Sequence, residues 1–237
     1  MTLPIVDGPK VSDLDEYLTK FIVSFCLGIV IACEKKEASS LFVPTRESGK
    51  LYKMDEHILA SVSGVVADAN SLIDVGRLHA QQHMYAQCTP IYVEQLVRYL
   101  ADQKHVYTLY GSSRPFGVSL MYAGWDAVQG FQLYCSDPSG NYAAWKAHAT
   151  GKNSVNAIST LKDDYREDLT LQEATVLAAK VLGKSMDMNK PTSERFEIGL
   201  ITRDASGAVV QKRLEGAELD QMLAEAKVFE ELANSKK

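Results

Sequence analysis

The clearest alternation of apolar and polar positions lies within Gly111–Lys152. Two apolar runs, Gly117–Tyr122 and Gly130–Tyr134, flank a loop, and the turn Asp137-Pro138-Ser139-Gly140-Asn141 then leads into Tyr142–Ala149. Alternation with a period of two indicates strands, and Asp, Pro, Gly and Asn are typical of tight turns. The segment therefore predicts three consecutive short strands.

The chain ahead of this block predicts more strands and then a pair of helices. Phe21–Cys33 is rich in Ile and Val and predicts one or two buried strands. Leu51–Met54 and Ile58–Ser63 predict two short strands, and Gly64 ends the second. Helices are expected over two further segments, Asp68–Tyr85 and Ile91–Thr108.

Helical spacing predicts which side chains of this pair share a face. In the first helix these are Leu72, Val75, Leu78 or His79, and Gln82 or His83. In the second they are Val93, Leu96, Val97 and Leu100. Thr89 is expected as the N-cap of the second helix, with Pro90 at its first helical position.

A second pair of helices is expected over Asn153–Tyr165 and Thr170–Met186. The first should point Val155, Ile158 and Leu161 inward, and the second should begin with a capping box of Thr170 and Glu173. A strand over Phe196–Thr202 and a charged amphipathic helix over Glu218–Asn234 complete the chain.

Helices thus occur in adjacent pairs between groups of strands, which differs from the strict alternation of a doubly wound sheet. The order favours an α+β fold with four layers, a helix pair on each outer face of two stacked antiparallel sheets. We expect residues 1–27 to form an arm with a short helix over Asp13–Lys20 and a strand. Residues 28–237 are expected to form one domain that includes the C-terminal helix.

Composition and charge disfavour several classes of function. The 237 residues carry a net charge of −5, with a pI near 5.6, which disfavours a general binder of nucleic acid or of membrane surfaces. Phe21–Cys33 is shorter than the ~20 residues of a membrane span, and the N-terminus lacks the pattern of a secretory signal. The four cysteines have no zinc-site spacing. We expect no cofactor, no metal, and a location in the cytoplasm and nucleus.

Candidate catalytic residues each have a simpler structural explanation. His79 and His83 lie four residues apart on a predicted helix, but the intervening residues lack the glutamate of an H-E-x-x-H zinc motif. Gly183-Lys184-Ser185 resembles the end of a phosphate loop but falls at a helix end, where the dipole repels phosphate. The acidic residues Asp163, Asp164, Glu167 and Asp168 are typical of a solvated surface. The sequence therefore shows no convincing active site.

Several blocks, in order along the chain, resemble the α-type subunits of the proteasome. They are Gly28–Lys36 (GIVIACEKK), Lys50–Met54 (KLYKM), Ser63–Ala69 (SGVVADA), Arg114–Gly117 (RPFG), Ser136–Tyr142 (SDPSGNY) and Phe196–Arg203. The resemblance runs from about Gly28 to about Asp204. Gly124–Asp126 (GWD), followed by GFQLY, is most similar to the member at the third position of the eukaryotic ring.

The resemblance implies the sandwich fold of the N-terminal-nucleophile hydrolases and a role without catalysis. Seven α-type subunits of the 20S core particle form an outer ring on a ring of β-type subunits. That outer ring admits substrates for ubiquitin-dependent and ubiquitin-independent degradation and docks regulatory particles. In the family, catalysis belongs to β-type subunits, through an N-terminal threonine whose amine is the base.

Two alternatives are kept. One is a catalytically active threonine hydrolase of the β type, although Thr19 lacks the preceding glycine that β propeptides show. The other is a free-standing scaffold or assembly factor that reuses the fold. The α-type family also begins with a Tyr-Asp-Arg tail and a ring-top helix that Met1–Leu27 does not match, so this stretch is either a remodelled gate or a gene-model artefact.

The resemblance also implies a docking site for the C-terminal tails of activators, in pockets between neighbouring α subunits. Lys50 would pair with the tail carboxylate, and the backbone at Gly64 and Val65 would approach the tail closely. The simpler explanation is that Lys50 is one more surface lysine and Gly64 only a turn glycine.

Overall fold

The computed structural model describes residues 20–25, 28–35, 49–151, 153–185, 196–214 and 219–220. One antiparallel sheet contains β1 (Lys20–Phe25), β2 (Gly28–Glu34), β8 (Ala147–Thr150), β9 (Phe196–Arg203) and β10 (Val209–Leu214). The other contains β3 (Leu51–Asp55), β4 (Ile58–Gly64), β5 (Val118–Asp126), β6 (Gly130–Ser136) and β7 (Tyr142–Ala144). The helices are α2 (Val66–Gln87), α3 (Val93–Leu109), α4 (Ser154–Asp164) and α5 (Leu171–Ser185).

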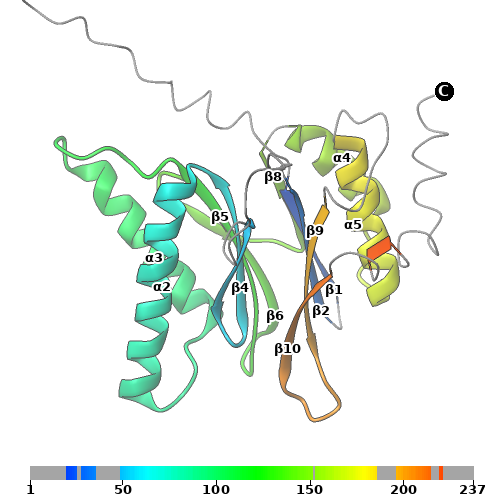
Figure 1. The fold of residues 1–237 in the computed structure, drawn as a ribbon, viewed down its shortest axis with the longest axis horizontal. Helices are drawn as coiled ribbons and strands as arrows, with labels where there is room; N and C mark the ends of the chain where they lie inside the picture. The colour runs from blue at the N-terminus through cyan, green and yellow to red at the C-terminus, as the bar shows by residue number, and fades with distance from the viewer. Residues whose placement is uncertain are drawn as a thin grey trace, which may run out of the picture.

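The two sheets stack face to face between two pairs of helices (Figure 1). The strand orders are β10-β9-β2-β1-β8 in the first sheet and β3-β4-β5-β6-β7 in the second. Helices α4 and α5 cover the outer face of the first sheet, and α2 and α3 cover that of the second. The predicted four-layer α+β sandwich is therefore confirmed.

Alternation along β2 shows how one strand serves two layers of the core. Ile29, Ile31 and Cys33 point between the sheets, where they join Leu51, Leu59 and Met121. Val30 and Ala32 point the other way, into the cluster under α4 and α5. All five β2 side chains are fully buried, as expected for a central strand covered on both faces.

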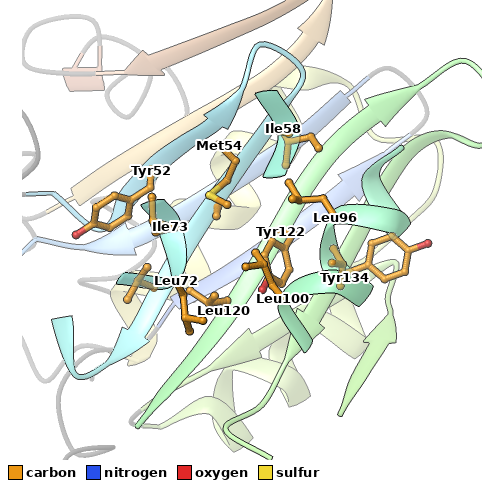
Figure 2. Close-up of a cluster of buried hydrophobic side chains, with 14 of the residues drawn as sticks. Tyr52, Met54, Ile58, Leu72, Ile73, Leu96, Leu100, Leu120, Tyr122 and Tyr134 are labelled. Atoms are coloured by element: carbon orange, nitrogen blue, oxygen red, sulfur yellow. The ribbon is translucent and has the colours of Figure 1, made fainter. Parts of the chain in front are cut away.

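A third cluster lies between α2, α3 and the second sheet (Figure 2). Leu72 and Ile73 of α2 and Leu96 and Leu100 of α3 pack over Tyr122 and its neighbours on the sheet. Each of these side chains is at most 1% exposed. This packing fixes the two helices across the strands whose ends carry the predicted docking residues.

The prediction of which α2 side chains share one packed face is partly wrong. Leu72 is buried, but Val75 and Leu78 are 37% and 59% exposed, and the buried stripe also takes in the small residues Ala69, Gly76 and Ala80. The reason is close approach: a Cβ built on Gly76 would lie 2.3 Å from Met54 Cε of β3. Val155 of α4 is likewise 76% exposed rather than inward.

The third strand predicted in the central block is in fact two strands in different sheets. Tyr142–Ala144 pairs with β6, and Ala147–Thr150 pairs with β1 of the other sheet. The chain crosses between the sheets at Trp145, whose N–H donates to Leu133 O at 2.9 Å. The prediction of one strand over Tyr142–Ala149 is therefore wrong, because the apolar pattern does not say which sheet a strand joins.

Local signals located the starts of the helices with mixed success. The capping box of α5 is confirmed: Glu173 N donates to Thr170 Oγ1 at 3.3 Å, and Thr170 N donates to Glu173 Oε2 at 2.8 Å. Helix α3 begins at Val93, after the predicted cap, and its N-cap residue Tyr92 makes no side-chain cap bond. The prediction of Thr89 and Pro90 at its start is wrong.

Three other expectations have different outcomes. Phe21–Cys33 forms two strands, β1 and β2, and strand β10 was not predicted. The helix predicted over Asp13–Lys20 and most of the one over Glu218–Asn234 lie outside the described residues. The division at residue 28 stays a prediction. None of the helices in the described part of the chain has the length and apolar character that crossing a membrane requires.

Candidate docking site at the start of helix α2

The sharp turn from β4 into α2 is built on Gly64 and Val65. Gly64 has a φ of +114°, a backbone conformation that side chains disfavour, and a Cβ there would lie 2.2 Å from Gly117 O. Val65 is the N-cap residue of α2, and its N–H donates to the same carbonyl, Gly117 O, at 2.9 Å. Only glycine fits at position 64, because the backbone of the neighbouring segment fills the space.

Lys50 directly precedes the neighbouring strand β3, at the same end of the sheet. Its carbonyl accepts a hydrogen bond from Val62 N at 3.1 Å, two residues before Gly64. Its Nζ donates to Glu34 O at 2.6 Å. The ammonium group therefore lies at the end of β2, in the other sheet. The structure thus brings Lys50, Gly64 and Val65 to one end of the sandwich. Whether they bind a tail stays a prediction.

A buried carboxylate holds the backbone beneath Lys50. Glu197 of β9 is 6% exposed and accepts a hydrogen bond from Lys50 N at 2.9 Å through Oε2. A Cβ on Gly49 would lie 2.4 Å from Glu197 Oε1. Arg213 of β10 approaches the same carboxylate and donates to Leu51 O. The position of Lys50 is therefore set by both sheets.

A second carboxylate, Asp68 in the first turn of α2, supports the Gly64–Val65 turn. Asp68 is 8% exposed and accepts from Arg114 Nη1 and Nη2 at 2.6 and 2.7 Å, and from Gly117 N at 3.0 Å. The hydrogen bonds from Arg114 hold the pKa of Asp68 below its ordinary value, despite the opposing effect of burial. Sequence reasoning did not assign these two residues a role at the site, although both stand in blocks that carry the family resemblance.

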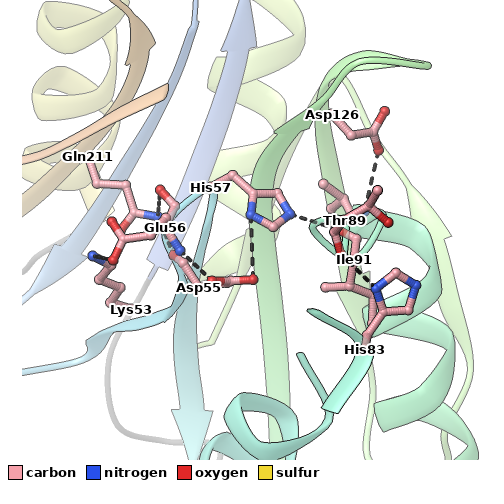
Figure 3. A network of polar contacts seen from close by, with 10 residues as sticks. Lys53, Asp55, Glu56, His57, His83, Thr89, Ile91, Asp126 and Gln211 are labelled. Carbon is pink, nitrogen blue, oxygen red and sulfur yellow. Dashed lines mark hydrogen bonds and ion pairs between the residues drawn. The ribbon is translucent and has the colours of Figure 1, made fainter. Parts of the chain in front are cut away.

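The opposite end of the second sheet carries a different polar network (Figure 3). His57 Nε2 lies 2.7 Å from Ile91 O and His57 Nδ1 lies 3.6 Å from Asp55 Oδ2, so the ring joins the β3–β4 hairpin to the segment before α3. Asp126, the last residue of β5, accepts from Val93 N at 3.3 Å and so replaces the missing side-chain cap of α3. A cavity of about 510 Å³ opens here between the β3–β4 turn, the segment before α3, the end of β5 and the β9–β10 turn.

Other residues considered for chemistry are occupied by structural contacts. The His79 ring stacks on Tyr99 with 3.6 Å between centroids, and His83 Nδ1 lies 3.0 Å from Thr89 O. Burial, and then the nearby His83, lower the pKa of His79. Glu167 and Asp164 form ion pairs with Lys146 and Lys180. Within the residues described, no three His, Cys, Asp or Glu side chains converge as a metal site would require.

Comparison with known proteins identifies the family. Residues 23–201 match the proteasome subunit family. The chain is 47% identical over 200 residues to proteasome subunit alpha type-4-2 of Oryza sativa subsp. indica, covering 84% of this chain and 80% of that protein. It is 45% identical over 199 residues to alpha type-4 of Petunia hybrida, with the same coverage, and 49% identical over 171 residues to alpha type-4-A of Arabidopsis thaliana, covering 72% of this chain and 68% of the relative. The chain therefore belongs to the proteasome subunit family, and these relatives all carry the name of one α-type subunit.

Proposed function

We propose that this chain is a non-catalytic subunit of the α ring of a 20S proteasome core particle. Its identity of 47% over 200 residues to a chain named alpha type-4 carries the proposal. In this role it contacts other α subunits in the ring and β subunits below it. It contributes to the entry surface for protein degradation, ubiquitin-dependent and ubiquitin-independent, in the cytoplasm and nucleus.

Assembly tests this role. The full chain, carrying an affinity tag and expressed in its own cells, is expected to sediment with a large complex and to co-purify with other proteasome subunits. A stable monomer in the extract would contradict the proposal. The alpha names of the relatives disfavour the β-type alternative, and sequencing the N-terminus of the assembled chain tests it. A chain processed to begin at an internal threonine would support the catalytic alternative instead.

The docking role extends this proposal to Lys50, Gly64 and Val65. The Lys50 ammonium offers a positive charge for the terminal carboxylate of an activator tail, and the tail would approach the backbone of the Gly64–Val65 turn, which glycine at position 64 makes possible. Lys50 precedes β3 and the turn follows β4, two adjacent strands, at one end of the sandwich, which supports this assignment. The bond from Lys50 Nζ to Glu34 O must be shared or exchanged when the tail binds.

A matched pair of lysine variants tests the docking role in the assembled particle. The probe is a synthetic peptide of the last residues of an activator subunit from the same organism, made with a free C-terminal carboxylate and as its C-terminal amide. Lys50→Met is expected to weaken the carboxylate form selectively. Lys53→Met changes an exposed lysine three residues further along, within β3, that pairs with Glu56, and should leave binding unchanged. Equal binding of both peptide forms to the unmodified particle would contradict the docking role.

A further inference from the structure

We propose that Asp68 and Arg114 act as positioning residues for the Gly64–Val65 turn, holding it in the geometry that receives a terminal carboxylate and keeping that end of α2 electrically neutral. The inference rests on the proposed docking function and names residues that the resemblance does not assign to it. It follows from a closed chain of contacts, from local crowding, and from the position of one charge.

The contacts form a loop that begins and ends on α2. Val65, the N-cap residue of the helix, donates through its N–H to Gly117 O at 2.9 Å. Gly117 N donates in turn to Asp68 Oδ2 at 3.0 Å, and Asp68 belongs to the first turn of the same helix. Both polar groups of the Gly117 backbone are thereby fixed by α2. A shift of Gly117 must then move the start of the helix.

Arg114 binds the Asp68 carboxylate from the solvent side. Its two terminal nitrogens donate to the two oxygens of Asp68 at 2.6 and 2.7 Å, and Nη1 also donates to Pro115 O at 3.2 Å. A fork of two parallel bonds fixes the orientation of a carboxylate, which a single point charge does not. The fork therefore aims Asp68 Oδ2 at Gly117 N.

Close packing between Gly117 and the Gly64–Val65 turn couples the orientation of Asp68 to the backbone of the turn. A Cβ on Gly64 would lie 2.2 Å from Gly117 O, and a Cβ on Gly117 would lie 3.0 Å from Val65 Cγ2. The two segments therefore touch without spare room. Since packed backbone cannot deform gradually, a change in the Asp68 side chain must alter the Gly64–Val65 backbone itself.

Charge gives the second part of the inference. A helix N-terminus favours an incoming carboxylate, but a negative side chain in its first turn opposes one. Asp68 is such a side chain, and the Arg114 guanidinium, which is 70% exposed, cancels its charge. Without Arg114 the approaching tail would face an uncompensated carboxylate. Arg114 is thus expected to decide how strongly the site prefers a tail with a free carboxylate over its amide.

Two measurements on the assembled particle separate this inference from the docking role. The first is hydrogen exchange of peptides covering Gly64–Val65, which reports the Val65 N–H directly. The second is binding of the activator-tail peptide in its carboxylate and amide forms. The variants are Arg114→Met, Arg114→Lys and the control Arg77→Met, which removes an arginine of α2 that bonds Lys53 O away from the turn.

Arg114→Met is expected to speed exchange at the turn and to weaken binding of the carboxylate peptide by about tenfold, because the peptide then approaches the uncompensated charge of Asp68 at the helix N-terminus. Binding of the amide peptide should barely change. Arg114→Lys should recover part of the preference for the carboxylate, because it restores the charge without the fork. Arg77→Met should match the unmodified particle in both measurements.

Each remaining outcome is decisive. If Arg114→Met keeps normal exchange or the normal preference for the carboxylate while Lys50→Met loses that preference, the positioning role is wrong and the docking role stands. If the unmodified particle shows no preference for the carboxylate, the docking role is wrong, and the inference about carboxylate capture falls with it. Exchange at Val65 still reveals in that case whether the contacts hold the turn.

Discussion

Asp68 of α2, which contacts the residue before β5, and Asp126, the last residue of β5, are both largely buried carboxylates, yet their charges are stabilised differently. Asp68 pairs with the exposed guanidinium of Arg114. Asp126 is instead held by neutral donors: Val128 N at 3.0 Å, Gln129 N at 2.8 Å, Gln132 Nε2 at 2.5 Å and Val93 N at 3.3 Å. Burial alone would raise the pKa of Asp126, but these hydrogen bonds lower it. Neutral hydrogen-bond donors therefore suffice to stabilise the structural carboxylate Asp126, whereas Asp68, at the proposed docking end, is stabilised by a cation at the surface.

Lys104 extends the comparison to a buried cation without a carboxylate bond. It is a fully buried residue of α3, and its Nζ donates to Val118 O at 3.1 Å and to Ser136 Oγ at 2.8 Å. It also lies within 3.5 Å of Ser136 O and 3.4 Å of Asp137 O. Burial lowers the pKa of Lys104 to about 7, opposed by the nearby Cys135 and Asp137. Neutral partners thus hold this charge less well than they hold that of Asp126.

The largest expected effect is the loss of the Asp126 network. Asp126→Ala should lower the free energy of unfolding by about 3 kcal/mol, because several buried donors lose their acceptor and α3 loses its cap. Denaturant titration of the purified chain measures this. Asp102→Ala, an exposed position on α3, should change stability by less than about 0.5 kcal/mol. A similarly small change for Asp126→Ala would show that the network is dispensable.

The next effect is a dependence of stability on pH that comes from Lys104. In the unfolded chain the lysine keeps a pKa of 10.5, compared with about 7 in the folded chain. Between these values the unfolded state binds more protons, so stability should rise with pH by about 1.4 kcal/mol per unit. Burial raises the pKa of Cys135 from 9.0 to about 11, so between these values its thiol lowers stability as pH rises and opposes the contribution of Lys104. The rise is therefore expected between pH 7 and pH 9.

Lys104→Met should remove this rise, whereas Lys184→Met, at an exposed position, should keep it. Unfolding titrations between pH 7 and 9 compare the three chains. The same slope in Lys104→Met would mean that another group carries the proton linkage.

The smallest effect directly contrasts the two carboxylates. Asp68→Asn removes the attraction to an exposed cation, so its cost should shrink in 1 M salt by a few tenths of a kcal/mol, because salt screens exposed pairs. Asp126→Asn disturbs hydrogen bonds from neutral groups and should cost the same in both conditions. Parallel thermal unfolding scans at low and high salt measure the two differences. Equal salt sensitivity would erase the proposed distinction.

The site residues that could be predicted are those in a recognisable local motif. Gly64 stands out because a glycine between a strand and a helix indicates a turn, and Lys50 was assigned through the family resemblance. Asp68 and Arg114 were not joined in the prediction because they are separated by 46 residues, and no local pattern announces a bidentate ion pair. The cap on α3 was misplaced for the same reason, since its acceptor is Asp126, 33 residues away.

The sequence by itself determined the layer architecture, the capping box of α5 and the order of helices and strands, apart from β10 and the separation of β7 from β8. Each of these depends on periodicity or on residues a few positions apart. Only the tertiary structure decided which face of α2 is buried, where the chain crosses between sheets at Trp145, and how Asp68 and Asp126 are neutralised. These outcomes depend on which distant segments meet. Close approach at Gly76 and Gly64, and hydrogen-bond partners supplied by other elements, select among arrangements that the local pattern leaves equal.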